Sequence, residues 1–218
     1  LAIAGELAAA VGHEIRNPLT SIKGFLQLLQ DKDAADKEKH YYTIMLSEIE
    51  RINSIVSEFI VLAKPQVINN QNENITSLLS DVITLLETLA IVKNIEVTKE
   101  FEPNVSLVKC EGNQIKQVLI NIFKNAIEAV ANKGKIHIMV SQMNKDSVRI
   151  RFMDNGPGIP TDLISRLGEP FYTTKEKGTG LGLMVSYKII ENHRGRINIS
   201  SEMNKGTTVD IILPASKE

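Results

Sequence analysis

Three polar residues near the start of the chain combine a nucleophile, a base and an amide. His13 and Glu14 are adjacent, and Asn17 follows His13 by four residues, which places His13 and Asn17 on one side of a helix. On an exposed flank, the imidazole of His13 could act as a nucleophile beside the carboxylate of Glu14. A helix histidine half-covered by its neighbours would look the same, so this segment alone leaves both interpretations open.

Two asparagines, Asn121 and Asn125, lie four residues apart in an apolar-periodic segment, and Glu128 follows on the same flank. Taken alone, such a pair is more often a surface feature with no further role. The alternative is that Asn125 offers a neutral oxygen to Mg²⁺, a hard cation that prefers oxygen ligands and accompanies nucleotide phosphates.

A turn sequence, Asp-Asn-Gly-Pro-Gly, follows a strand-like segment at residues 154–158. This composition is common in ordinary turns. In a functional interpretation, Asp154 accepts a hydrogen bond from an adenine amino group. Gly156 and Gly158 would then let the backbone approach the ring and take positive φ angles.

A glycine-rich turn at residues 178–182 (GTGLG) leads directly into a predicted helix. Unpaired N–H groups and the helix dipole make such a turn a ready anion site. It lacks the Gly-Lys-Ser/Thr of a P-loop, and no strand precedes it, which excludes the dinucleotide-binding fingerprint. The preceding residues 169–175 include Tyr172 and Lys175. We expect a mobile lid there, with Lys175 and Lys177 meeting phosphate oxygens.

The elements that must position these residues fall into two groups, and the first is a pair of helices. Apolar residues recur at three- and four-residue spacing from Leu1 to Gln30 and from Tyr42 to Ile60. The second helix is predicted to end at Lys64, before Pro65. A charged turn at residues 31–39 would join them into an antiparallel hairpin. Because a hairpin cannot bury both apolar stripes alone, we expect a homodimer that forms a four-helix bundle.

The second group is a mixed arrangement of helices and strands after a polar linker at residues 66–74. Helices interspersed with hairpins are typical of a mixed sheet with helices on one face, so the fold class is α+β. Asn74 or Thr76 is the expected cap of the first helix. The predicted helices span residues 75–91, 114–131 and 181–193, and the predicted strands span residues 95–101, 106–110, 135–142, 147–153, 196–201 and 207–213.

The 218-residue chain has an ordinary globular composition, with 43% hydrophobic and 23% charged residues. Its net charge of −1 gives no general attraction to nucleic acid or anionic lipid. Cys110 is the only cysteine, which excludes an intrachain disulfide and fits a reducing cytosol. No uninterrupted run approaches the roughly 18 apolar residues of a membrane span. The first helix has no cap residue ahead of it, so we expect the cytoplasmic portion of a longer protein, with membrane anchoring of that protein left open.

In their order and spacing, these segments resemble the catalytic core of a sensor histidine kinase over essentially the whole chain. Residues 13–19 (HEIRNPL) look like the phosphoacceptor box. This box and the Tyr-Thr-Thr-Lys lid are most similar to those of the sporulation kinases of endospore-forming bacteria. The family's N, G1, F, G2 and final glycine boxes are matched, in order, at residues 121–125, 154–158, 171–175, 178–182 and 205–208.

The resemblance implies a dimerisation and phosphotransfer hairpin over residues 1–65, a linker over residues 66–74 and an ATP-binding domain over residues 75–218. That domain would be an α/β sandwich of the kind shared with gyrase and Hsp90. His13 would take the γ-phosphate of ATP and pass it to an aspartate on the receiver domain of a response regulator. A small inhibitor protein that binds the base of the hairpin is also expected if the likeness to sporulation kinases holds.

Motif positions also imply roles for single residues. Asn125 matches the Mg²⁺ ligand and Asp154 the adenine acceptor, and Asn17 would position water for dephosphorylation of the regulator. Glu14 is the nearest carboxylate that could take the proton released by His13. The other implied ATP-site residues are Asn121, Gly156, Gly158, Tyr172, Lys175, Gly178, Gly180, Gly182 and Thr207.

Two positions depart from the family's pattern, and two alternatives remain. Glu128 stands where many relatives carry a basic residue, and Thr173 where many carry arginine, so a lid lysine would have to supply the cation. An ATPase of the same fold is one alternative, but those relatives carry a water-activating glutamate where this chain has Asn121. A non-catalytic nucleotide-binding scaffold is the other, against which Glu14 and the otherwise complete set of boxes argue.

Overall fold

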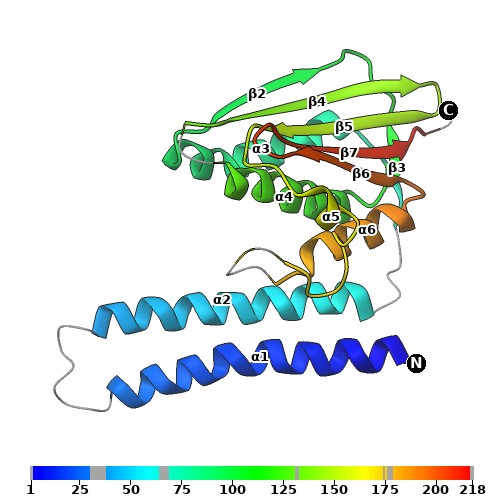
Figure 1. Ribbon diagram of the computed structural model, residues 1–218. Helices are drawn as coiled ribbons and strands as arrows, with labels where there is room; N and C mark the ends of the chain where they lie inside the picture. The colour runs from blue at the N-terminus through cyan, green and yellow to red at the C-terminus, as the bar shows by residue number, and fades with distance from the viewer. Residues whose placement is uncertain are drawn as a thin grey trace. The chain divides into compact units, whose positions relative to one another are not determined.

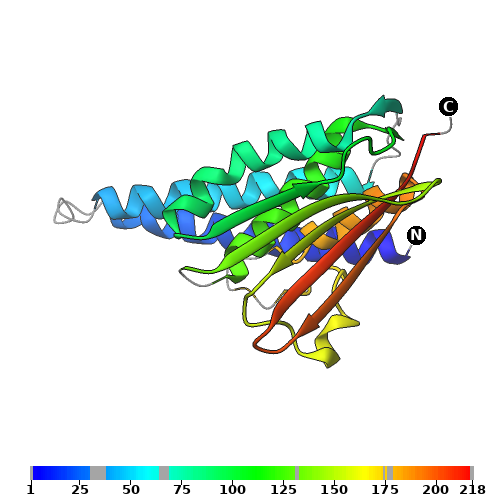
Figure 2. The same ribbon diagram turned by 90° about the horizontal axis from the view of Figure 1, so that it is seen from above.

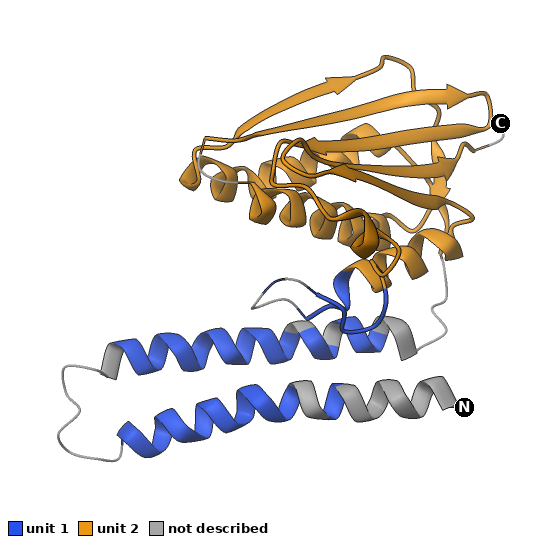
Figure 3. Ribbon diagram, in the orientation of Figure 1, with its two compact units in different colours: residues 1–66, 169–182 blue, residues 67–168, 183–218 orange. Residues whose placement is uncertain are grey.

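The chain forms two compact units, drawn in blue and orange in Figure 3. Unit 1 comprises Leu1–Gln66 and Glu169–Gly182, and unit 2 comprises Val67–Gly168 and Leu183–Glu218. The computed structural model describes residues 2–29, 38–63, 69–130, 133–173, 175 and 179–216.

Unit 1 is built on two antiparallel helices, α1 (Ala2–Leu29) and α2 (Glu38–Ala63), which confirms the predicted hairpin (Figure 1). The end of α1 meets the start of α2, where the rings of Phe25 and Tyr41 lie with centroids 5.2 Å apart. The predicted turn at residues 31–39 lies largely outside the described residues. The hairpin leaves an apolar stripe exposed on both helices, as expected for half of a four-helix bundle: Leu19, Leu26, Leu28, Tyr42, Leu46, Ile49, Val56 and Ile60.

Unit 2 contains a five-stranded mixed sheet whose strands are, in spatial order, β2 (Glu96–Phe101), β4 (Lys135–Asn144), β5 (Ser147–Asp154), β7 (Gly206–Pro214) and β6 (Arg196–Glu202). β2 and β4 run parallel, and the other neighbours run antiparallel. One face of the sheet is covered by α3 (Ile75–Val92), α4 (Gly112–Ala129) and α6 (Gly182–Asn192), as Figures 1 and 2 show. The α+β class and the one-sided arrangement of helices are therefore confirmed.

The core of unit 2 lies between this sheet and its helices. Phe152 on β5 meets Phe123 on α4, with ring centroids 6.1 Å apart. On the opposite face of β5, the guanidinium of Arg151 forms two hydrogen bonds with Asp210, at 2.6 and 2.7 Å. This alternation follows from the two-residue period of a strand. The buried residues of β4 and β5 are Ile136, Ile138, Val140, Val148, Ile150 and Phe152.

The start of α4 is held by a chain of hydrogen bonds. The carboxylate of Glu111 accepts from the backbone N–H groups of Asn113 and Gln114, at 3.2 and 2.8 Å. The backbone N–H of Glu111 donates to Nε2 of the buried His193, at 3.1 Å. Nδ1 of His193 lies 2.8 Å from the carbonyl oxygen of Ile189, so it must carry the ring hydrogen. His193 thereby ties the end of α6 to the cap of α4.

α3 begins at a side-chain cap and is strongly apolar. Oδ1 of Asn74 accepts from the backbone N–H of Ser77 at 3.2 Å, which confirms one of the two predicted caps. Among the helices in the described ranges, α3 alone is long and apolar enough to cross a membrane by length and composition. Asp81 and Glu87 interrupt this segment in the sequence, so it does not stand out as an apolar run. Its buried face packs in the core of unit 2.

Part of the predicted linker at residues 66–74 is a strand instead. Gln71–Glu73 form β1, which pairs antiparallel with β3 (Val108–Cys110). Three polar residues that pair only through their backbone leave no side-chain signal for a strand. The short helix α5 (Thr161–Ile164) likewise has no apolar period long enough to predict it.

Candidate active site

A cluster of predicted site residues lies at the end of β5 in unit 2. Oδ1 of Asp154 accepts hydrogen bonds from the backbone N–H groups of Gly156 and Thr207, at 2.9 and 3.2 Å. Burial raises the pKa of the Asp154 carboxyl, and these two hydrogen bonds partly oppose the rise. No donor to Oδ2 is found among the described residues. One oxygen is therefore held by the backbone and the other can accept from a ligand, which fits the amino group of adenine.

The two glycines of this turn behave differently. Gly158 has a φ of +76°, as predicted, and a Cβ there would collide with the carbonyl oxygen of Glu202. Gly156 does not take a positive φ, so that part of the prediction is wrong. A Cβ on Gly156 would lie 3.2 Å from the carbonyl oxygen of Ala129, at the end of α4. Close packing thus requires glycine at position 158, whereas a Cβ at position 156 would also press on Oδ1 of Asp154, at 2.9 Å.

α4 brings the two predicted asparagines into a hydrogen-bonded row. Nδ2 of Asn121 donates to Oγ of Ser186 at 2.8 Å, and Nδ2 of Asn125 lies 3.5 Å from Oδ1 of Asn121. Both amides are half-buried, so they are more than surface decoration. Glu128 on the same helix pairs with Lys124 at 4.0 Å.

Ser186 is a residue of this cluster that sequence reasoning misses. It lies on α6, where it is only 1% exposed, within a buried stripe that includes Val185 and Ile189. A buried hydroxyl needs a hydrogen-bond partner, so a serine within an apolar stripe is the one sign in the sequence that Ser186 makes such a contact. The partner, Asn121, is 65 positions away in the chain, so only the fold reveals it.

The chemistry of the donor set bears on which metal could bind. Within the described ranges, no group of three His, Cys, Asp or Glu side chains could hold a metal ion. A magnesium ion that takes one amide oxygen and otherwise phosphate oxygens and water does fit, with Asn125 as the predicted ligand.

In unit 1, α1 carries the predicted phosphoacceptor segment in unbroken helical backbone. Asn17 is exposed, and Ile15 is half-buried. The side chains of His13 and Glu14 lie outside the described residues, so their orientation stays a prediction.

The described residues of the glycine-rich turn belong to unit 1. Gly180 has a φ of +70°, and a Cβ there would lie 2.6 Å from Cα of Phe171, so only glycine fits. Oγ1 of Thr179 accepts from the backbone N–H of Leu181 at 3.3 Å and donates to the carboxylate of Glu58 on α2 at 2.8 Å.

The structure thus brings the predicted residues together in separate groups. Asp154, Gly156 and Thr207 form one cluster and the two asparagines a second, both in unit 2. Tyr172 and Lys175, which are half-buried, belong to unit 1 with Gly180 and Gly182, the first residue of α6. Gly178 and Lys177 lie outside the described residues.

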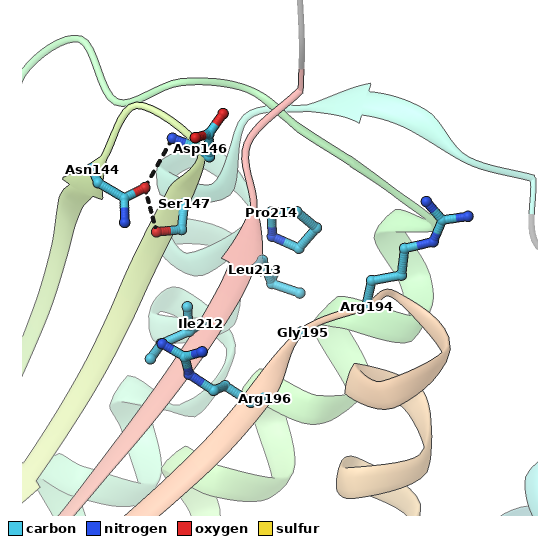
Figure 4. A pocket seen from close by; sticks show the side chains of 9 residues that line it. All are labelled: Asn144, Asp146, Ser147, Arg194, Gly195, Arg196, Ile212, Leu213 and Pro214. Carbon is cyan, nitrogen blue, oxygen red and sulfur yellow. Dashed lines mark hydrogen bonds between the residues drawn. The ribbon is translucent and has the colours of Figure 1, made fainter.

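A cavity of about 330 Å³ lies at the opposite end of β5 from Asp154 (Figure 4). Part of its wall is the β4–β5 turn, where Oδ1 of Asn144 accepts hydrogen bonds from the N–H of Asp146 and the hydroxyl of Ser147, each at 2.9 Å. None of the predicted site residues lines this cavity, so it is separate from the Asp154 cluster.

Two family models match the chain. Residues 4–68 match the His Kinase A (phospho-acceptor) domain. Residues 110–217 match the histidine kinase-, DNA gyrase B- and HSP90-like ATPase. The first range contains α1 and α2, and the second contains α4, the strands β4 to β7 and the Asp154 cluster.

Curated relatives include five sporulation kinases of Bacillus subtilis (strain 168). The chain is 48% identical to Sporulation kinase E over 214 residues, which is 98% of this chain and 29% of that protein. Four further sporulation kinases of the same organism are 40% to 47% identical. The chain spans between 29% and 50% of the length of these five relatives.

Solved structures agree with this likeness. The catalytic domain of histidine kinase ThkA is 36% identical with a TM-score of 0.62, over 67% of this chain and 96% of that one. Histidine kinase ThkA in complex with response regulator protein TrrA is 35% identical with a TM-score of 0.84, over 99% of this chain and 63% of that one. The chain therefore belongs to the histidine kinase family.

Proposed function

We propose that this chain is the catalytic core of a sensor histidine kinase, which uses ATP to phosphorylate His13 and then passes the phosphoryl group to an aspartate of a response regulator. The observation that carries this proposal is the carboxylate of Asp154, whose Oδ1 is held by two backbone hydrogen bonds while its Oδ2 has no donor among the described residues. The role of His13 as the phosphoryl acceptor is supported by the match of residues 4–68, which contain His13, to a phospho-acceptor domain.

Two sets of residues would bind the nucleotide. Asp154 accepts the adenine amino group, with Gly156, Gly158 and Thr207 shaping the turn around it. Asn121 and the glycine-rich turn would bind the phosphate end; the residues of that turn and of the lid are Tyr172, Lys175, Gly178, Gly180 and Gly182. Mg²⁺, held by Asn125 and the phosphates, would offset charge on the transferring phosphoryl group.

Phosphorylation of His13 needs a neutral ring nitrogen aligned with the γ-phosphorus of ATP. The new N–P bond forms as the bond from phosphorus to the bridging oxygen of ADP breaks. The proton on the other ring nitrogen passes to Glu14, the adjacent carboxylate. Asn17, one turn along α1 and exposed, would position water when the partner regulator is dephosphorylated.

Partners follow from the same assignment. The receiver domain of a response regulator would dock on the hairpin near His13, and the complex of the relative ThkA with response regulator TrrA supports this. The likeness to sporulation kinases supports a place in a sporulation phosphorelay, with a small inhibitor protein binding the base of the hairpin. The exposed apolar stripe of α1 and α2 supports a homodimer in which two hairpins form a four-helix bundle.

The domain assignment is a phosphotransfer hairpin at residues 1–65, a linker at residues 66–74 and an ATP-binding domain at residues 75–218. Strand β1 belongs to the last part of that linker. We also propose that the chain is the cytoplasmic portion of a longer sensor kinase, because it spans between 29% and 50% of the length of the five sporulation kinases.

The chemistry at Asn121 argues against the rival ATPase. An amide cannot take a proton from water, and both ends of this amide already face partners, Ser186 and Asn125. A kinase needs no base at this position, because its nucleophile is the histidine.

The test is incubation of the full chain with MgATP labelled in the γ-phosphate. The kinase retains label on the protein, and this label is lost in acid and stable in alkali. His13→Gln should abolish it while nucleotide binding remains. Free labelled phosphate without labelled protein would support the ATPase, and equal labelling of His13→Gln would contradict the role of His13.

A further inference from the structure

We infer that Ser186 is a positioning residue, which sets the orientation of two asparagine amides so that the oxygen of Asn125 faces the nucleotide-bound Mg²⁺. This inference rests on the proposed function and concerns the same site. Ser186 touches neither metal nor nucleotide in this scheme, and it acts only through Asn121.

The hydroxyl of Ser186 is placed for this role by burial and distance. Its side chain is 1% exposed, and Oγ accepts from Nδ2 of Asn121 at 2.8 Å. A buried hydroxyl is costly unless it is hydrogen-bonded, so packing alone would favour alanine on this stripe of α6. Serine in a helix commonly donates its hydrogen to a carbonyl one turn earlier, which leaves its oxygen as an acceptor for Asn121.

The orientation of one amide then determines that of the next. An asparagine has one acceptor oxygen and one donor NH₂ group. With its NH₂ on Ser186, Asn121 turns its oxygen toward Asn125, whose Nδ2 lies 3.5 Å away. The NH₂ of Asn125 therefore faces along α4, and its oxygen faces away from Asn121. A hard cation takes that oxygen and would be repelled by the NH₂ group.

Without the hydroxyl, Asn121 loses the acceptor that holds it. The amide can then turn its NH₂ group toward Asn125, which would draw the oxygen of Asn125 away from the metal. Residues that orient a metal ligand typically change metal affinity by about 10- to 100-fold when they are replaced. The 3.5 Å link is long for a hydrogen bond, so we expect the lower end of that range, about tenfold.

The experiment is a titration of the full chain with a fluorescent, non-hydrolysable ATP analogue, first in EDTA and then at increasing Mg²⁺. In Ser186→Ala, the Mg²⁺ concentration for half-maximal enhancement of binding should rise about tenfold. The affinity in EDTA should change less than the Mg²⁺ dependence, because adenine is still held by Asp154. Ser186→Thr keeps the hydroxyl and should restore the wild-type Mg²⁺ dependence. Ser186→Cys replaces the hydroxyl by a slightly larger group that is a weaker acceptor, and it is the second variant if the alanine variant does not fold.

The matched control is Ser80→Ala, since Ser80 is also a helix serine of unit 2 and donates to the carbonyl of Thr76 at 2.8 Å, away from the asparagines. It should leave the Mg²⁺ dependence unchanged. A wild-type Mg²⁺ dependence in both Ser186→Ala and Ser186→Cys would overturn the inference, as would an equal loss of affinity with and without Mg²⁺. Failure of the unsubstituted chain to bind the analogue would instead overturn the proposed function, and this inference with it.

Discussion

Replacement of Asp154 by asparagine should separate nucleotide recognition from folding. In Asp154→Asn, the remaining oxygen can still accept the backbone N–H groups of Gly156 and Thr207, so the turn keeps its hydrogen bonds. The second oxygen becomes an NH₂ group, which donates and cannot accept. The amino group of adenine would then face another donor.

The size of the effect follows from the hydrogen bond that is lost. A hydrogen bond to a charged group contributes about 1.5–3 kcal/mol, so ATP affinity should fall about 10- to 150-fold. The new NH₂ group can donate to the 6-oxo group of hypoxanthine. The preference for ATP over ITP should therefore shrink or reverse in Asp154→Asn.

Asp154→Asn should lower ATP affinity without lowering the stability of the fold. Burial raises the pKa of Asp154 above its unfolded value of 3.8. The stability from this shift is present below that unfolded pKa and is lost as pH rises through the folded value, so the ionised group is unfavourable for folding at neutral pH. Asparagine carries no charge, and the melting temperature of Asp154→Asn should equal or exceed that of the wild type. ATP affinity of the wild type should fall as pH is lowered through the same raised pKa.

Calorimetric titrations with ATP and ITP analogues, paired with thermal unfolding, measure all of these effects. Asp210→Asn is the matched control, because Asp210 is also a half-buried aspartate of the sheet but bonds Arg151 on the open face. It should lose stability and keep nucleotide affinity. If Asp154→Asn bound ATP like the wild type, or lost affinity only together with its folded structure, the assignment of Asp154 as the adenine acceptor would be refuted.

Four further substitutions test other parts of the account. Glu14→Ala should slow autophosphorylation about 10²- to 10⁴-fold, and full activity would refute its role as base. Asn17→Ala should spare autophosphorylation and lower phosphatase activity toward the regulator; an equal loss of both would contradict its role with water. His193→Ala leaves the N–H of Glu111 unpaired and should lower the free energy of unfolding, measured in urea, by about 1–3 kcal/mol. An unchanged urea midpoint would show that this hydrogen bond does not stabilise the fold. Leu46→Glu places a charge where a 61% exposed leucine lies on the apolar stripe and should give monomers in sedimentation, whereas a persisting dimer would exclude this face as the interface.

Most of the fold could be predicted because apolar side chains reveal the period of each element. In α4, Ile115, Val118, Leu119 and Ile122 recur at helical spacing in the sequence, and all four are buried. The turn at Asp154 was predictable too, since Asp and Gly are the residues that a tight backbone approach requires. These features depend on residues close together in the chain.

The rest depends on contacts between distant residues or on the backbone alone. The polar strand Gln71–Glu73 pairs through backbone groups that every sequence has. His193 meets Glu111 across 82 positions, and Ser186 meets Asn121 across 65, so neither pair has a local signal. Polar residues in apolar stripes mark where such contacts are needed, but only the fold identifies the partner.

The central claim is that the phosphate of ATP comes to rest on one imidazole. The most direct measurement is mass-spectrometric mapping of peptides from the full chain after reaction with MgATP, with digestion kept at neutral to alkaline pH to preserve phosphohistidine. The account predicts phosphate on the peptide that contains His13, localised to that residue. Phosphate on another residue, or an unmodified peptide from a chain that has consumed ATP, would contradict it.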